Sequence, residues 1–136
     1  MEIRRSSEEI KEEVRRRLQQ HNAEYMAEGK DYSCHIEQDG AVSAGIVAEA
    51  VGDTVEVEFL YVDKARRGGG LGSRLLRHVE AEAAKDGMRR VLLNTYSFQA
   101  PGFYAKVGYR RLFEITPCFD RHSQFFFVKE LEEAGR

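Results

Sequence analysis

A strand-like run leads directly into a glycine-rich loop at residues 54–72, which read TVEVEFLYVDKARRGGGLG. The alternation predicts a half-buried β-strand over 54–62. Its apolar face is expected to hold Val55, Val57, Phe59 and Tyr61. A helical pattern begins at Leu71, directly after the glycines. Backbone N–H groups at such a junction converge on one point, where the positive end of the helix dipole adds to them. The junction therefore predicts a site for a phosphate-bearing ligand.

Two common phosphate-binding motifs do not fit this loop. No Gly-Lys-Ser/Thr follows the glycines, which excludes a Walker A motif. The preceding strand belongs to an antiparallel series, and no acidic residue closes the expected second strand, which argues against a dinucleotide fingerprint. Four flanking arginines still favour anion binding over a merely flexible loop: Arg66, Arg67, Arg74 and Arg77.

The rest of the chain predicts a mixed sheet with few helices. Strands over 32–38 and 41–51 are separated by Asp39-Gly40, a hairpin signal. A helix from Leu71 should end at Gly87. The strand that follows it should lie parallel to the 54–62 strand, since the two flank a crossover helix. The remaining elements are a strand over 90–95, a helix over 99–107, and strands over 109–116 and 124–131 joined by a loop over 117–123.

An amphipathic helix is predicted near the N-terminus, before Gly29. Ser6 followed by Glu9 forms a capping-box pattern, with Ser6 as the N-cap. The apolar stripe has helical spacing and charged residues opposite it. It consists of Ile10, Val14, Leu18 and Tyr25, with His21 on the same face.

Composition narrows the function classes. The chain has 136 residues, which predicts a single domain over 1–136. Its net charge is −2, whereas a domain that grips nucleic acid carries a clear positive excess, so we expect no nucleic-acid partner. No segment approaches a membrane span of about 18 apolar residues, and no secretory h-region begins the chain, which predicts a cytoplasmic protein without a membrane partner. Cys34 and Cys118 lack the spacing of a disulfide framework or a metal site, so no metal is expected.

Two motifs carry a resemblance to a known family. Residues 67–72, RGGGLG, resemble the Arg/Gln-x-x-Gly-x-Gly/Ala signature of the GNAT superfamily of acetyl-CoA-dependent N-acetyltransferases, and residues 60–63, LYVD, resemble the end of that family's fourth strand. Residues 100–109, APGFYAKVGY, are similar to its Ala-x-x-Phe-Tyr-x-Lys-x-Gly-Phe element. Residues 97–101 and 122–124 also look like those of short bacterial members.

The resemblance implies a fold and an activity. The fold would be α/β (α+β): a mixed, mostly antiparallel sheet of six to seven strands with about three helices. The family's fourth and fifth strands would run parallel and splay at the cofactor site. The activity would be transfer of an acetyl group from acetyl-CoA, as co-substrate, to a primary amine of a small-molecule or peptide acceptor. The amine would attack directly in a ternary complex.

The resemblance also implies a set of cofactor-binding residues. The backbone amide of Tyr61 or Val62 would bind the oxyanion. Asn94 and Ser97 are alternatives for the side chain that contacts the cofactor arm, because Ser97 stands where the family often has Asn. The residues implied in and beside the loop are Arg67, Gly68, Gly69, Gly70, Leu71, Gly72 and Ser73.

Three side chains are implied as catalytic. Presenting a lysine-like amine in its neutral form at pH 7 costs roughly 4–5 kcal/mol, which a carboxylate base would offset. Glu58, nearer the strand end, is the first choice for that base and Glu56 the second. Tyr104 matches the family's general acid. Because proton transfer from Tyr to a thiolate is uphill by roughly 2 kcal/mol, Tyr104 would act mainly as a hydrogen-bond donor.

Several questions stay open at this point. His122, in the predicted loop, would flank the acceptor site. The acidic residues Glu49, Asp53, Glu56 and Glu58 suggest a cationic acceptor. Two alternatives are a catalytically silent acyl-CoA-binding module and a protein whose glycine loop binds another phosphate ligand. A homodimer is also left open.

Overall fold

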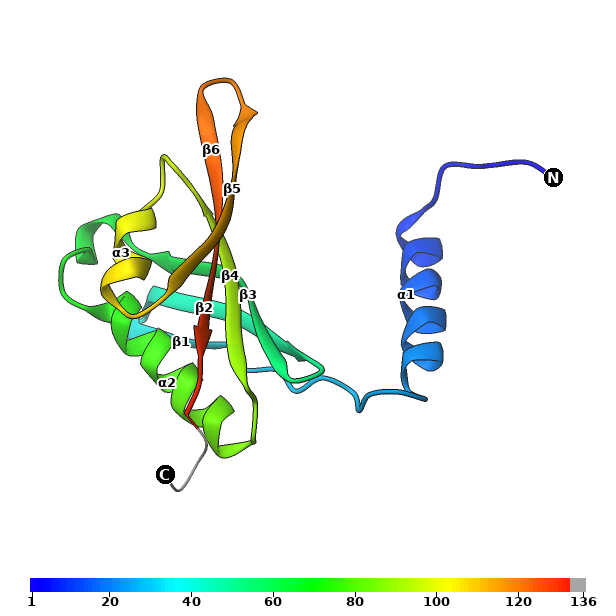
Figure 1. Cartoon of the computed structure of the whole chain (residues 1–136), viewed down its shortest axis with the longest axis horizontal. Coiled ribbons are helices and arrows are strands. Elements are labelled where there is room, and N and C mark those ends of the chain that lie inside the picture. The colour runs from blue at the N-terminus through cyan, green and yellow to red at the C-terminus, as the bar shows by residue number, and fades with distance from the viewer. Residues whose placement is uncertain (133–136) are drawn as a thin grey trace.

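Six strands form one sheet in the computed structural model of the chain, which describes residues 1–132 (Figure 1). The strand order is β1-β2-β3-β4-β6-β5, and every neighbouring pair is antiparallel except β3 and β4. The strands are β1 (Cys34–Gln38), β2 (Ala41–Val51), β3 (Thr54–Val62), β4 (Arg90–Tyr96), β5 (Arg110–Phe119) and β6 (His122–Glu130). The helices are α1 (Glu8–Asn22), α2 (Leu71–Lys85) and α3 (Pro101–Lys106), with a 3₁₀ turn over Lys64–Arg66. This architecture confirms the predicted fold class.

The parallel strands separate soon after they meet. β3 and β4 pair over Thr54–Glu56 and Arg90–Leu92, and beyond Glu56 they diverge (Figure 1). This divergence is the splay expected of the family's fourth and fifth strands, which are β3 and β4 here.

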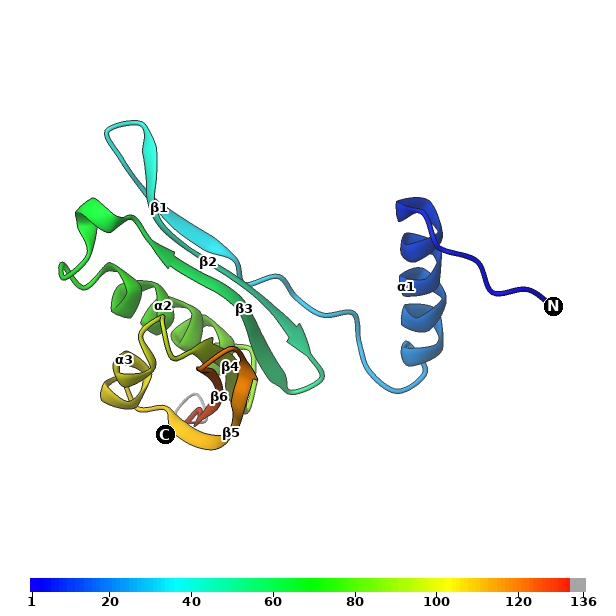
Figure 2. The same cartoon turned by 90° about the horizontal axis from the view of Figure 1, so that it is seen from above.

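One face of the sheet is covered and holds the core. The apolar stripe of α2 packs on it and consists of Leu71, Leu75, Leu76, Val79 and Ala83. The strands contribute fully buried side chains such as Ile46, Val55 and Val91. α1 stands clear of the sheet, so the other face is open (Figure 2). We call these two surfaces the covered face and the open face.

A β-bulge changes the alternation within β3. Ala48 pairs with Val57 and Val47 with Phe59, so Glu58 has no cross-strand partner. Beyond the bulge, Leu60 packs against the core, whereas Phe59 is 62% exposed and Tyr61 52% exposed. The prediction that Phe59 and Tyr61 share the apolar face of Val55 and Val57 was therefore wrong. An extra residue in one strand shifts every later side chain to the other face.

Several element boundaries also differ from prediction. The N-cap of α1 is Ser7, not Ser6, and its side chain accepts the Ile10 N–H at 3.3 Å. The helix ends at Asn22 rather than continuing towards Gly29. α3 is shorter at both ends than the predicted 99–107 helix, and β1 begins at Cys34.

The predicted loop over 117–123 is instead part of a hairpin. β5 continues to Phe119, and only residues 120–121 separate it from β6, so His122 is the first residue of a strand. The pairing is irregular between Ile115 and Phe119. Pro117 lies within that irregularity, where its missing N–H costs no ladder hydrogen bond. Of the helices in residues 1–132, none is long and apolar enough to span a membrane.

Candidate active site

The glycine loop joins the end of β3 to the start of α2. Gly68 and Gly70 have positive φ angles of 88° and 81°, which favour glycine. The space that a Cβ would occupy at either position is open. Gly70 is the N-cap of α2 and forms no side-chain capping bond, and the first turn contains no acidic residue. The first amides of this 15-residue helix therefore face outward without a capping side chain, as an anion site requires.

Contacts hold the loop against β3 and α3. Arg67 Nε donates to the Val62 carbonyl oxygen at 3.3 Å. A Cβ on Gly72 would lie 3.5 Å from Val62 Cγ2 and 3.6 Å from Phe103 Cζ. Ser73 Oγ accepts from the Arg77 guanidinium at 2.8 Å. The predicted loop residues thus come together with the end of β3 and the start of α3.

The direction of the backbone amides at the end of β3 distinguishes between Tyr61 and Val62 as the donor to the oxyanion. The Asp63 amide donates to the Ser43 carbonyl of β2 at 2.8 Å. Successive amides of a strand in an antiparallel pair point to opposite sides. The Tyr61 amide therefore faces β2, and the Val62 amide faces the side on which β4 has separated.

Tyr104 lies on α3 beside this junction. It is 8% exposed and packs against the rings of Phe103, Tyr109 and Phe127. Burial raises the pKa of its hydroxyl, so the neutral donor form is favoured. Within residues 1–132 that hydroxyl has no hydrogen-bond partner, whereas the neighbouring Tyr109 hydroxyl donates to Glu80 at 2.9 Å. Tyr104 is thus the buried tyrosine whose hydroxyl is available to a ligand.

A hollow of about 640 Å³ opens on the open face, where the pairing of β3 and β4 ends. Glu56 and Glu58 both line it, together with Asn94 and Phe126. The structure thus brings the two predicted carboxylates together.

The hollow also holds a row of carboxylates across neighbouring strands. The backbones of Asp31 and Glu49 pair in an isolated antiparallel β-bridge, and Glu49 is directly opposite Glu56. Like charges in such positions destabilise a sheet. None of Glu49, Glu56 and Glu58 forms an ion pair with another residue of the described chain. The Ser33 side chain, and the Ser33 N–H that donates to the Asp31 carboxylate at 2.8 Å, lower the pKa of Asp31 and keep it ionised. The row is therefore electrostatically suited to a cation.

Asn94 and Ser97, the two alternatives for the cofactor arm, lie apart. Asn94 Oδ1 accepts from Gln124 Nε2 at 3.1 Å and lines the hollow with the carboxylates. Ser97 Oγ accepts from the Ser123 N–H at 3.0 Å and so joins the end of β4 to the start of β6. In the described chain, neither side chain forms a hydrogen bond with the glycine loop.

An aromatic cluster beside the end of β4 was not anticipated. Tyr96 and Phe98 stack with ring centroids 5.4 Å apart, and Phe98 meets the His122 ring at 5.1 Å. Phe119 packs against all three. The sequence singles out His122 alone, because the aromatic residues at 96–98 and 119–122 meet only when β6 pairs with β4.

Comparison with known proteins agrees with this geometry. The model of the Acetyltransferase (GNAT) family matches residues 1–109. The Blasticidin-S acetyltransferase of Streptomyces morookaense is 38% identical over 101 residues, which are 74% of this chain and 73% of that protein.

Solved structures share the fold. An acetyltransferase from Bacillus cereus ATCC 14579 superposes with a TM-score of 0.82 and 30% identity, covering 96% of this chain and 98% of that one. A protein described as a streptothricin acetyltransferase of Bacillus anthracis str. Ames, in complex with acetyl coenzyme A, has a TM-score of 0.68 and 19% identity, with 81% and 68% covered. The chain belongs to the GNAT acetyltransferase family and is an acetyl-CoA-dependent acyltransferase.

Proposed function

We propose that the chain, as a single domain, transfers an acetyl group from acetyl-CoA to a primary amine by direct attack in a ternary complex. The observation that carries this proposal is the splay of β3 and β4. The glycine loop, the Val62 amide and Tyr104 lie around one side of the splay, and the unpaired carboxylates line the hollow on the other. Donor and acceptor can thus meet through the sheet.

The loop binds the pyrophosphate of the donor through backbone amides. Its outward-facing amides, open space and lack of a first-turn carboxylate fit a doubly charged anion. When bound, acetyl-CoA supplies the thioester carbonyl and a thiolate leaving group. The residues assigned to this task are Arg67, Gly68, Gly69, Gly70, Leu71, Gly72 and Ser73.

The Val62 amide stabilises the negative charge that develops on the thioester oxygen. An aimed, pre-positioned N–H is effective there because it needs no reorganisation during the reaction. We assign this role to Val62 rather than Tyr61, since the Tyr61 amide is directed at β2.

Glu58 takes the proton from the amine, directly or through water, with Glu56 as the second candidate. Glu58 is the bulged residue, and a bulge re-aims a side chain next to a site. It is also nearer the splayed end of β3. Tyr104 donates a hydrogen bond to the departing thiolate, in keeping with the raised pKa of its hydroxyl.

The acceptor is a small cationic amine. The carboxylates of Asp31, Glu49, Glu56 and Glu58 around one hollow support this class. The name of the Streptomyces relative, an acetyltransferase of blasticidin S, favours an antibiotic-like small molecule over a peptide.

The test is CoA release from acetyl-CoA in the presence of a panel of amines. The panel should contain blasticidin S, other cationic small molecules, neutral amines of similar size and peptides with free amino groups. We expect turnover to be fastest with a cationic small molecule and to fall as ionic strength screens the carboxylates. Equal rates with neutral and cationic amines would argue against the assigned acceptor class.

A further inference from the structure

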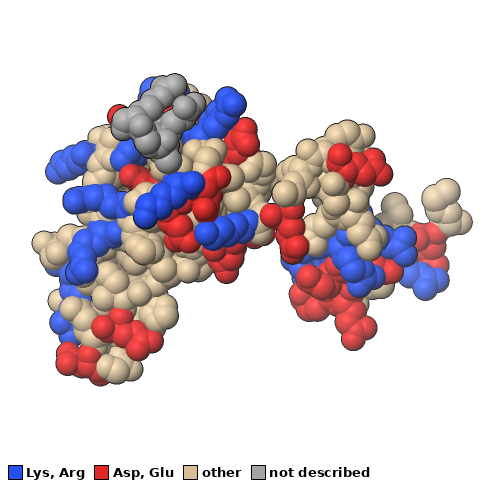
Figure 3. Space-filling model, turned by 90° about the horizontal axis from the view of Figure 1, so that it is seen from below, with Lys and Arg blue, Asp and Glu red and all other residues tan. Residues whose placement is uncertain are grey.

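The first 29 residues form an N-terminal arm that stands away from the rest of the molecule (Figures 1 and 2). α1 buries none of its residues. Val14 is 61% exposed and Leu18 58% exposed, although both belong to the helix's apolar stripe. Figure 3 shows the arm as a separate lobe that carries both basic and acidic side chains. An amphipathic helix with an unpartnered apolar face indicates an interaction surface.

The surface area of the chain supports the same conclusion. The chain exposes 10190 Å², whereas a compact monomer of 15.6 kDa exposes about 7,300 Å². The difference, about 2,900 Å², exceeds the roughly 1,600 Å² of a standard protein–protein interface. The chain therefore exposes enough additional surface for a stable complex.

The open face of the sheet is a suitable partner for the α1 stripe. It presents the half-exposed side chains of Val47 and Val51, which line the hollow, and of Phe113, which stacks on Phe126 of the same hollow. A helix of 15 residues is about 22 Å long, close to the width of six strands spaced about 4.8 Å apart. The match is apolar rather than electrostatic, because four acidic and four basic residues balance within α1, and Arg15 and Arg17 form ion pairs with Glu12 and Glu13.

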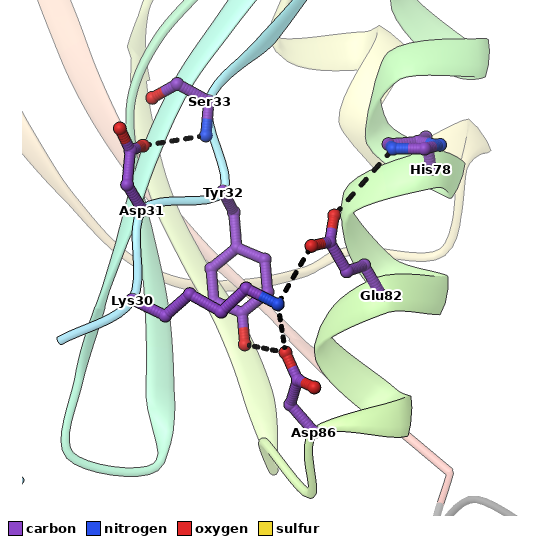
Figure 4. A network of polar contacts seen from close by, with 7 residues as sticks. All are labelled: Lys30, Asp31, Tyr32, Ser33, His78, Glu82 and Asp86. Atoms are coloured by element: carbon purple, nitrogen blue, oxygen red, sulfur yellow. Dashed lines mark hydrogen bonds and ion pairs between the residues drawn. The ribbon is translucent and has the colours of Figure 1, made fainter.

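The arm leaves the sheet from a fixed point. Lys30 Nζ lies 2.9 Å from an Asp86 carboxylate oxygen and 3.0 Å from Glu82, and the Tyr32 hydroxyl donates to Asp86 at 2.7 Å (Figure 4). The Ala50 amide donates to the Lys30 carbonyl at 2.9 Å. A Cβ on Gly29 would lie 2.0 Å from the Ala50 carbonyl oxygen, so only glycine fits there. These contacts attach the base of the arm firmly to β2 and α2.

The solved Bacillus cereus structure contains the counterpart of this arm. Residues 30–136 make up less than four fifths of the chain, so a superposition covering 96% of it includes most of the arm. The TM-score of 0.82 is higher than residues 30–136 could reach alone. The placement of the arm is therefore a shared feature of the fold.

We propose that α1 of one copy packs its apolar stripe on the open face of a second copy, and that the exchange is reciprocal. The product is a two-fold symmetric dimer in which the same pair of surfaces is used twice. A second copy is the preferred occupant because the chain itself carries both complementary surfaces. Each partner helix would also close the hollow of Glu56 and Glu58, a consequence that rests on the proposed function.

Sedimentation equilibrium of the full chain tests the exchange. We expect a mass about twice 15.6 kDa for the wild type. Leu18→Arg should give the monomer mass, because it places a charge in the stripe. Gln19→Arg is the matched control, since it adds the same charge on the other side of the same helix and should remain dimeric. A monomeric wild type, or a Leu18→Arg variant that stays dimeric, would overturn the proposal.

A mixing experiment separates exchange from docking of α1 on its own sheet. Leu18→Arg disables the arm and Val47→Arg disables the open face, so each variant alone should be monomeric. Their mixture should form a dimer through the one intact arm and the one intact face. If the mixture stays monomeric, exchange between copies is wrong.

Two further measurements distinguish a failure of the dimer proposal from misfolding of the variant and from a failure of the proposed function. Acetyl-CoA binding by Leu18→Arg, measured by calorimetry, should equal that of the wild type and report an intact body. The KM for the amine should rise severalfold in the same variant, with the KM for acetyl-CoA unchanged. An unchanged amine KM in a monomeric variant would refute the role in closing the hollow but not the dimer. A wild type without acetyl transfer would refute the proposed function and leave the mass measurement standing.

Discussion

The two faces of the sheet are formed by the same strands but differ in what covers them and in which side chains they present. On the covered face, α2 buries Val55 and Val91 completely. On the open face, the same strands present Glu56, Glu58 and Asn94 around a hollow. β3 serves both, because Val57 points into the core and the next residue, Glu58, bulges out of the pairing. In the proposed function, the donor binds on one side of the sheet and the acceptor on the other, so substitutions on the two sides should affect them separately.

The largest effect is expected at the donor side, with Gly70→Asp. The added carboxylate would lie where the loop amides meet the pyrophosphate, so acetyl-CoA affinity should fall by roughly a hundredfold or more. Gly87→Asp is the matched control, since Gly87 has the same φ of 81° and open space at the other end of α2. Calorimetry should show near wild-type affinity for that control. Equal acetyl-CoA affinity in both folded variants would show that the glycine loop does not bind the donor.

Tyr104→Phe should act on the rate and leave binding unchanged. The hydroxyl acts on charge that develops as the thiolate leaves, so kcat should fall by about ten- to a thousandfold while acetyl-CoA affinity changes little. The variant should also discriminate more strongly than wild type between acyl donors with good and poor leaving groups.

Tyr109→Phe provides the control for this ring. Its hydroxyl already donates to Glu80, so its loss should lower the free energy of unfolding by about 1–3 kcal/mol without changing leaving-group discrimination. The same kcat for wild type and Tyr104→Phe, where chemistry limits the rate, would make Tyr104 a structural aromatic only.

Glu58→Gln should affect the acceptor side alone. The rate should fall by about tenfold or more near neutral pH and recover partly at high pH, where the amine loses its proton without a base. The KM for acetyl-CoA should stay constant. Glu56→Gln is the matched comparison from the same hollow, and a larger pH-dependent loss there would transfer the role of base to Glu56.

The smallest effect is expected for Tyr32→Phe, at the base of the arm. Burial, and to a smaller extent the hydrogen bond to Asp86, raise the pKa of Tyr32 to about 12. A raised pKa contributes stability that is present below the ordinary value of about 10 and is lost as pH rises through about 12. The wild type should therefore lose up to about 2 kcal/mol more than the variant between these pH values, measured by denaturant unfolding. Parallel pH curves would show that the pKa of Tyr32 is not raised in the folded chain.

Local signals account for much of the fold. The alternation over Thr54–Val62 predicted β3 with its observed bounds. Asp39 and Gly40 have φ angles of 55° and 76°, as their hairpin signal requires, and Gly87 ends α2 with positive φ. Each of these features depends on residues within a few positions of one another, which is why the sequence could predict them.

Features that depend on packing could not be predicted. The alternation through Glu58 is unbroken in the sequence, so nothing local marks the bulge that exposes Phe59 and Tyr61. The stripe of α1 predicts an apolar face but not what covers it. In the same way, the residues of the glycine loop were predictable from a contiguous motif, whereas the ring contact between Phe98 and His122 depends on how β4 and β6 pair.

Initial rates measured against both substrates test the central claim most directly. If donor and acceptor meet through the splay, double-reciprocal plots at several fixed amine concentrations should intersect, because both must bind before transfer. Parallel lines, together with an acetylated enzyme detected by mass spectrometry in the absence of amine, would contradict direct attack. They would instead place a nucleophile of the chain, such as Cys34 or Cys118, between the two substrates.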